Sequence, residues 1–461
     1  MVNASLKIGA WWLVLGAFAL GGCTTTPNDD PSSGTGGGSN SSSSGGTAGG
    51  GTGGGSGGIP VPACGQPGAK LETSVIAKRP GRGIGITFSP DGSRIAACGR
   101  FRSPSPSPRY DVKIYDSMTG DFIKEFGCPD YWTSAVVWSN NPTLGDVIAS
   151  GNYGHAVELW NTSGPGTTQC PSVPYFEEVD GGIRKLPLID GAVTWLSFSP
   201  NGHLLAVANR DPSVRLFQIQ PGDNQFKVVA YWSESYSANF TSVAWSPDGK
   251  RLAATERSGG TGKVTVWAFD ETKDLWDQAR IDEFAKLARD KQEGWAGQDV
   301  NLPFTRRMPL WSVDGDAFWT TDFLPDGKKV AAVSEDGRLG VYDATTGTEV
   351  FHFDTPMGSG LVAMDYSPAG DFIAAGAKNG NIYLIDAMSG QLADTLVGHH
   401  SGLSALAWSP DACALVSTAG GPRICAGGGI TTCHECSGVD GICPEWSDDL
   451  DARIWRFVPG K

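Results

Sequence analysis

Cysteine is the residue whose spacing most clearly suggests chemistry in this chain of 461 residues. Four of its ten cysteines lie close together near the C-terminus, where Cys433-His434-Glu435-Cys436 has the C-x₂-C spacing of zinc and redox sites. The four are Cys425, Cys433, Cys436 and Cys443. In an oxidising compartment such residues form structural disulfides instead. Because the N-terminal segment described below reads as an export signal, we expect two disulfides here, with zinc binding and redox activity as the alternatives.

Other residues with catalytic potential do not converge in the sequence. The six histidines are spread over different segments without ligand spacing, and Asp314-Gly315-Asp316 is too short for a calcium loop. No nucleophile stands beside a base, as an enzyme would require. We therefore expect no catalytic residue, no cofactor and a non-enzymatic role.

Charge and composition narrow the class of protein. Lysine and arginine total 35 against 49 aspartates and glutamates, a net charge of −14. This excess of acid argues against a nucleic-acid ligand, because that affinity depends on basic residues that neutralise phosphates. Hydrophobic residues make up 40% of the chain, enough to bury a large core.

The N-terminus carries an apolar run from Ile8 to Leu20, too short to span a bilayer comfortably but of the length of a signal-peptide core. The run ends in Leu20-Gly21-Gly22-Cys23, which resembles the lipobox of bacterial lipoproteins. The resemblance implies a signal peptide over residues 1–22, lipidation of Cys23 and export to the cell envelope. Thr24, rather than Asp, follows the cysteine, and this favours the outer membrane. The alternative is an ordinary secretory signal with an incidental cysteine.

Residues 23–63 follow as a linker that is almost entirely Gly, Ser and Thr from Ser33 to Gly58. Such a composition cannot offset the entropy of folding, so we expect a flexible tether. We therefore expect the membrane to be contacted through the lipid alone.

Residues 64–461 contain seven repeats of one pattern. A short apolar strand runs into Ser-Pro-Asp-Gly or a variant, as in Ile86 to Gly92 and Val243 to Gly249. Pro and Gly at these positions form a tight turn, so each copy predicts a hairpin. A third strand ends in an aromatic or apolar residue, and a fourth follows a Thr-Gly or Ser-Gly turn. Four strands repeated in this way predict a β-propeller.

These repeats resemble the WD-repeat family, most closely at Asp343 to Gly347 and Asp386 to Gly390. The resemblance implies an all-β, seven-bladed propeller in which the strand near residues 71–77 completes the last blade. It also implies structural roles for the residues at the family's tetrad positions and for the last terminal aromatic. These are His399, Asp211, Asp336, Asn379, Asp449 and Trp455. Three repeats have Arg109, Gly154 and Thr261 where the family has Asp, so most blades lack the full tetrad.

Two insertions interrupt the repeats. Residues 271–305 contain apolar positions at Ile281, Phe284, Ala285 and Ala288, which predict one short amphipathic helix. We expect this stripe to pack on the propeller, with partner docking as the alternative. Residues 419–451 form the cysteine-rich insertion between the second and third strands of the last blade.

The remaining cysteines suggest further bridges. Cys98 lies in an apolar second strand and is the best candidate for a free buried thiol. Cys128 and Cys170 flank the second repeat and are a plausible pair. Cys64 is a candidate partner of Cys413, since both belong to the closing blade.

The WD-repeat resemblance implies a protein or peptide partner on the top face, which is lined by the loops that enter the first strands and the loops before the third strands. The candidate binding residues by offset are Trp132, Arg210, Asn239, Glu335, Lys378 and Asp448. We therefore expect a membrane-anchored, exported scaffold in the cell envelope. The alternatives are a lactonase-like or quinoprotein-like propeller enzyme and a TolB-like envelope component.

Overall fold

The computed structural model describes residues 70–75, 81–101, 109–127, 133–152, 157–164, 184–185, 192–210, 213–219, 226–233, 239–283, 308–356, 358–399, 401–421 and 452–458. The chain divides into two units, Met1–Gly58, none of which is described, and Ile59–Lys461, which contains every described element. The signal peptide, Cys23 and the linker therefore lie outside the described residues.

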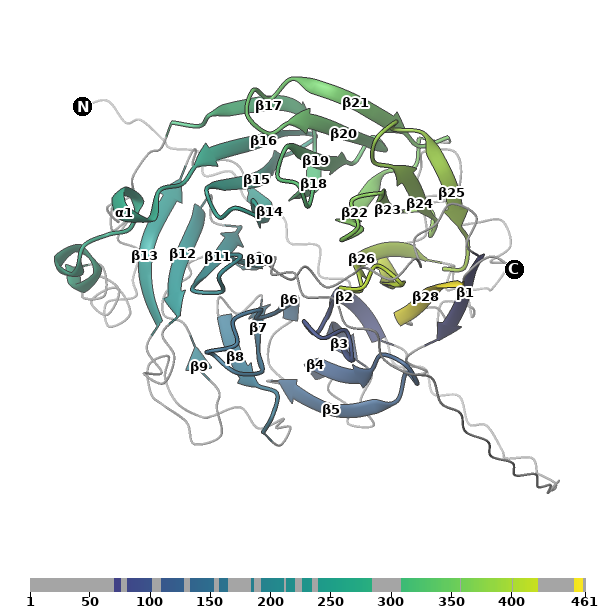
Figure 1. Cartoon of the computed structure of the whole chain (residues 1–461), viewed down its shortest axis with the longest axis horizontal. Helices are drawn as coiled ribbons and strands as arrows, with labels where there is room; N and C mark the ends of the chain where they lie inside the picture. The colour runs from purple at the N-terminus through teal and green to yellow at the C-terminus, as the bar shows by residue number, and fades with distance from the viewer. Residues whose placement is uncertain are drawn as a thin grey trace, which may run out of the picture. The chain divides into compact units, whose positions relative to one another are not determined.

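The second unit consists of seven four-stranded antiparallel sheets arranged around a ring (Figure 1). Each blade is given from its innermost strand outwards. The first blade consists of β2 (Gly81–Phe88), β3 (Arg94–Phe101), β4 (Arg109–Asp116) and β5 (Phe122–Gly127), and the second of β6 (Thr133–Trp138), β7 (Val147–Asn152), β8 (Val157–Asn161) and β9 (Arg184–Lys185). The third consists of β10 (Val193–Phe198), β11 (Leu204–Asn209), β12 (Ser213–Ile219) and β13 (Phe226–Ser233), and the fourth of β14 (Asn239–Trp245), β15 (Arg251–Ser258), β16 (Thr261–Ala268) and β17 (Trp311–Asp316).

The other three blades complete the ring. The fifth blade consists of β18 (Phe318–Phe323), β19 (Lys329–Ser334), β20 (Arg338–Asp343) and β21 (Glu349–Asp354), and the sixth of β22 (Leu361–Tyr366), β23 (Phe372–Ala377), β24 (Ile382–Asp386) and β25 (Leu392–Leu396). The last blade consists of β26 (Gly402–Trp408), β27 (Ala414–Gly421), β28 (Ala452–Val458) and β1 (Lys70–Val75). The prediction of an all-β, seven-bladed propeller is confirmed.

The ring is closed by its first strand. β1 pairs antiparallel with β28, with Thr73 opposite Trp455, and so supplies the outermost strand of the blade that holds the C-terminal repeat. The innermost strands β2 and β26 contact each other across the same junction. Closure by a strand near residues 71–77 is confirmed, with the strand shifted one to two residues towards the N-terminus.

The hairpin between the first and second strands follows one design in six of the seven blades, the second blade being the exception. In the first blade the Gly92 amide donates to the Ser89 carbonyl at 2.8 Å, and the Ser89 hydroxyl donates to Asp91 at 2.5 Å. Gly92 has a φ of 72°, a left-handed conformation that glycine adopts without steric cost. In the last blade Ala412 holds this position with a φ of 58° and is the one described non-glycine residue with positive φ.

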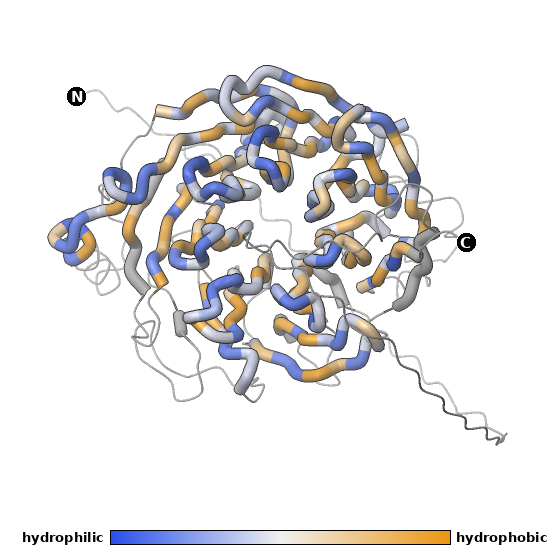
Figure 2. Tube along the Cα trace, viewed as in Figure 1, coloured by the Kyte–Doolittle hydropathy of each residue, from blue (hydrophilic) through white to orange (hydrophobic). Residues whose placement is uncertain are grey.

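The core lies between blades. The second strands β11 and β23 are buried at every residue, and Figure 2 shows hydrophobic segments along the strands with hydrophilic segments at the turns. Each hydrophobic cluster joins neighbouring blades; for example, Trp160 of the second blade lies 5.6 Å, between ring centres, from Phe126 of the first. Burial of this kind, worth about 25 cal/mol per Å², holds the blades together.

Hydroxyl groups also join the innermost strands, whose inner edges have no neighbouring strand. Thr194 donates to the Phe240 carbonyl at 2.8 Å, Thr241 donates to the Phe318 carbonyl at 3.0 Å, and Thr320 donates to the Val362 carbonyl at 2.9 Å. Ser134 makes the same contact with Val193. These bonds link the innermost strands of neighbouring blades directly.

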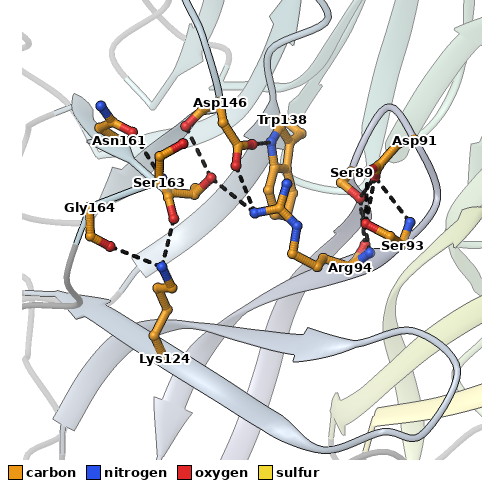
Figure 3. A network of polar contacts seen from close by, with 11 residues as sticks. Ser89, Asp91, Ser93, Arg94, Lys124, Trp138, Asp146, Asn161, Ser163 and Gly164 are labelled. Atoms are coloured by element: carbon orange, nitrogen blue, oxygen red, sulfur yellow. Dashed lines mark hydrogen bonds and ion pairs between the residues drawn. The ribbon is translucent and has the colours of Figure 1, made fainter.

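The two faces of the ring carry different turns. We call the face with the turns between second and third strands the top face, and the opposite face the bottom face. On the bottom face Arg94 of the first blade forms an ion pair of 2.7 Å with Asp146 of the second, and Trp138 Nε1 donates to the same carboxylate at 2.8 Å (Figure 3). Lys124 donates to the carbonyls of Thr162 and Gly164 at 2.7 and 2.9 Å. These contacts fasten the first two blades together.

The insertion after β16 differs from the prediction of one helix. It forms α1 (Glu271–Asp274) and a second helical segment over residues 278–283, interrupted at Leu275, where the backbone is extended. Asp270 caps the first helix, while Asp277 accepts from the Arg280 amide at the start of the second. Between them Trp276 turns into the core, so the chain cannot continue as one helix.

Ile281 packs against the clusters of blades two to four, as expected for a stripe that covers the propeller. Phe284, Ala285 and Ala288 lie outside the described residues. Among the helices that the structure describes, none is both long and apolar enough to cross a bilayer.

Candidate functional site

A group of charged and aromatic side chains on the top face spans the fourth, fifth and sixth blades. We call Arg257, Trp319, Glu335 and Lys378 the top-face cluster. Arg257 stands near the end of β15, Trp319 is the second residue of β18, and Glu335 and Lys378 directly follow β19 and β23. Backbone bonds fix the two turn residues: the Glu335 amide donates to the Ala317 carbonyl and the Lys378 amide to the Gly360 carbonyl, both at 2.9 Å.

The Glu335 carboxylate lies between the two cations. One oxygen accepts a hydrogen bond from Lys378 Nζ, and the other lies 3.3 Å from an Arg257 guanidinium nitrogen. The guanidinium stacks over Trp319 at 4.3 Å from the ring centre, and Lys378 Nζ lies 5.9 Å from the same ring. The arrangement therefore combines two ion pairs with two cation–π contacts.

The electrostatics favour an ionised carboxylate in this cluster. Burial alone raises the pKa of Glu335, but the hydrogen bond and charge of Lys378, followed by the charge of Arg257, outweigh it and leave the pKa below its ordinary value. Trp319 Nε1 lies near the carboxylate and makes the smallest contribution to lowering this pKa. This indole nitrogen is buried, and its geometry is too poor for a hydrogen bond. The carboxylate is thus charged at neutral pH and surrounded by donors.

The structure brings part of the predicted top-face set together. Glu335 and Lys378 are in direct contact, and Asn239 is exposed and opposite Arg257 in the strand register. Arg210 lies on the third blade, where its backbone amide donates to Ala192. Trp132 and Asp448 lie outside the described residues.

Sequence reasoning missed Arg257 and Trp319. One signal was present for Arg257: Glu256 and Arg257 place two adjacent charges near the end of β15, whereas among the other second strands only β3 has a charged residue, Arg100, near its end. Trp319 gave no signal, because an aromatic residue at the start of an innermost strand looks like core.

The predicted structural residues of the last blade form a buried network. His399 Nε2 and Trp455 Nε1 contact the Ser417 hydroxyl at 2.7 and 2.8 Å. Trp160 donates to Ser150 at 2.8 Å in the same way in the second blade. In these two blades the contact ties the third strand to the second strand. Asp449 and Asp211 lie outside the described residues.

Asp336 and Asn379 act locally in their turns. Asp336 accepts from the Ser334 hydroxyl at 2.5 Å and from the Arg338 amide at 3.2 Å. Asn379 donates to the Tyr383 hydroxyl at 3.2 Å and accepts from the Asn381 amide at 3.0 Å. Both side chains therefore stabilise the turn that positions Glu335 or Lys378.

The cysteines are described only in part. Cys98 is a buried free thiol, as predicted, and burial raises its pKa to about 12, so it is inert near neutral pH. Cys413 is disulfide-bonded, but the cysteine bonded to it lies outside the described residues. Cys64 also lies outside them, so the pairing of Cys64 with Cys413 stays a prediction. The other predicted disulfide cysteines also lie outside the described residues: Cys128, Cys170, Cys425, Cys433, Cys436 and Cys443. No group of three or more potential metal ligands occurs among the residues that are described.

Two aspartates occupy equivalent positions on neighbouring innermost strands, Asp322 on β18 and Asp365 on β22. Asp365 accepts from the Trp408 amide of the next blade at 2.6 Å and from the Tyr366 amide at 2.9 Å. Enclosure of the carboxyl group raises the pKa of Asp322 to about 7. Enclosure, together with the nearby charge of Asp322, raises the pKa of Asp365 to about 8.

Comparison with known families identifies four repeats in the chain. A model of the WD domain, G-beta repeat, matches residues 185–218, 229–268, 347–386 and 390–425. The first three matches each begin within or just before the outermost strand of one blade and end in the third strand of the next. The sequence repeat is therefore offset by one strand from the blade, which interlocks neighbouring sheets. The chain contains WD repeats, as the resemblance implied.

Several characterised proteins are similar to this chain. The "Meiotic recombination protein rec14" of Schizosaccharomyces pombe is 36% identical over 106 residues, or 23% of this chain and 34% of that protein. A "Guanine nucleotide-binding protein subunit beta" of Nicotiana tabacum is 23% identical over 354 residues, or 74% of this chain and 79% of that protein. The "Eukaryotic translation initiation factor 3 subunit I" of Emericella nidulans is 30% identical over 162 residues, or 35% and 39% of the two chains.

Proposed function

We propose that this protein is a non-catalytic scaffold that binds a protein partner through the top face of its propeller. The observation that carries the proposal is the top-face cluster, in which three blades contribute charged side chains around one half-buried tryptophan. Tryptophan and arginine are the residues most often found at binding hot spots. Two of the similar proteins are named as subunits, which agrees with a role in assembly.

We further propose that the scaffold is exported and anchored in a bacterial cell envelope through Cys23. The apolar run, the Leu20-Gly21-Gly22-Cys23 motif and the Gly/Ser-rich segment support this part of the proposal. The similar proteins named above are eukaryotic, so they offer it no support.

Site-specific photocrosslinking tests the binding face. A crosslinking amino acid at Asn239, exposed on the top face, is expected to yield a discrete crosslinked product in intact cells. The matched control is Lys250, exposed in the bottom-face hairpin of the same blade. Products of equal yield at both positions, or at Lys250 alone, would contradict a top-face partner.

Fractionation with palmitate labelling tests the anchor. The natural chain is expected to take up the label and to sediment with membranes. A Cys23→Ala chain is expected to lose the label; if it stays labelled, Cys23 is not the lipidation site.

A further inference from the structure

The guanidinium of Arg257 has fewer hydrogen-bond acceptors than it can use. It can donate five hydrogen bonds, yet among the described residues it makes none of good geometry. Its contacts are the 3.3 Å approach to Glu335 and the stack over Trp319. The side chain is 27% exposed, so part of this group remains open to a ligand.

The cluster as a whole is short of negative charge. Two cations, Arg257 and Lys378, share the single carboxylate of Glu335, which leaves one positive charge in a chain whose net charge is −14. Trp319 Nε1 adds a buried donor without a partner. A carboxylate supplies two acceptor oxygens and matches the fork of an arginine, so it is the group that these donors fit best.

We propose that the top-face cluster binds an acidic peptide segment, with a partner carboxylate on Arg257 and the adjacent side chain packed beside Trp319. Glu335 occupies the site in the free protein and competes with the incoming carboxylate for Lys378 and Arg257. Its displacement costs little, because both ion pairs are partly exposed to solvent, and such pairs contribute little to stability. This inference rests on the proposed top-face function and names the chemistry of its partner.

A cationic partner does not fit the same surface. Lysine side chains would meet Arg257 and Lys378 at close range, where like charges repel. An uncharged peptide offers only neutral carbonyl acceptors, and their hydrogen bonds to a guanidinium are weaker than those of a carboxylate. Charge complementarity therefore selects acidic segments.

Binding of defined peptides to the purified full chain tests this inference. We expect labelled hexaglutamate to bind measurably by fluorescence anisotropy, and hexaglutamine and hexalysine to bind at least ten-fold more weakly. Hexaglutamate affinity is expected to fall about ten-fold between 50 and 300 mM salt, since the screening length drops from above about 10 Å to well below it over this range.

Variants separate binding from stability. Arg257→Gln is expected to weaken hexaglutamate binding about ten-fold. Glu335→Gln is expected to strengthen it several-fold, because it removes the internal competitor; a residue with only a structural role would not have this effect. Lys328→Gln, the same charge change at an exposed bottom-face position, is the control and should leave affinity unchanged.

Three outcomes would overturn the inference: hexaglutamine binding as tightly as hexaglutamate, Glu335→Gln weakening the binding, or an oligothymidylate of equal charge binding as well as the peptide. If Asn239 still crosslinks to a partner in cells while hexaglutamate fails to bind, only the acidic chemistry is wrong. If neither occurs, the proposed function fails with it.

Discussion

At the scale of single residues, the enclosed carboxyls of Asp322 and Asp365 make stability depend on pH in an unusual direction. Their raised folded pKa values, about 7 and 8, compare with about 3.9 in an unfolded chain. Their contribution to stability is therefore complete below about pH 4 and is lost as the pH rises through 7 to 8. We expect Asp322→Asn to raise the free energy of unfolding by about 1–3 kcal/mol at pH 8.5 and to change it little at pH 4.5. Urea denaturation at the two pH values measures this, with Asp326→Asn, an exposed aspartate of the same hairpin, as the control. An equal effect of Asp322→Asn at both pH values would show that the carboxyl does not titrate in this range.

At the scale of elements, hairpin turns with the same sequence pattern differ in how much stability a substitution of their glycine costs. Gly202 and Gly370 both have positive φ, 67° and 77°. A Cβ on Gly370 would have no atom within 4 Å, whereas one on Gly202 would lie 2.3 Å from Asn141 Cβ of the neighbouring blade. We expect Gly370→Ala to cost about 1 kcal/mol from backbone strain alone. Gly202→Ala adds a steric clash and is expected to cost about 2–4 kcal/mol in all. Urea unfolding of the two variants checks this, and equal losses would mean that Asn141 yields without cost.

The same elements show what a sequence can predict here. The turns, the third strands and the closing strand follow from local pattern, because Pro fixes φ, Gly permits a positive φ, and alternation determines the buried face. The close approach of Gly202 to Asn141 could not be predicted, since Asn141 belongs to the one hairpin that departs from the pattern. The break at Leu275 was missed because Trp276 is drawn into a core built by distant strands. Half of the top-face cluster was missed for the same reason: Arg257 and Trp319 meet only after three blades are assembled.

At the scale of the whole molecule, the ring depends on a strand supplied from the opposite end of the chain. A chain that begins at residue 77 lacks β1 and leaves β28 as an unpaired edge. We expect such a chain to unfold at lower urea concentration by several kcal/mol, at about 1 kcal/mol for each lost hydrogen bond, and to self-associate. A chain that begins at residue 65 keeps β1 but lacks Cys64, so it separates strand pairing from any disulfide at that residue. Equal stability of the two shortened chains would show that β1 contributes little to closure.

The pairing of β1 with β28 also has a mechanical consequence. Lys70, the first residue of β1, is paired with Val458, near the C-terminal end of β28. Tension transmitted along the chain from the N-terminal side therefore reaches the ring first at this pair. When the opposing force acts on the C-terminal end of β28, the antiparallel register makes the strand detach by unzipping, one residue pair at a time, rather than by shearing all six pairs together. The blade that completes the circle is thus also the point at which a pulling force would open it.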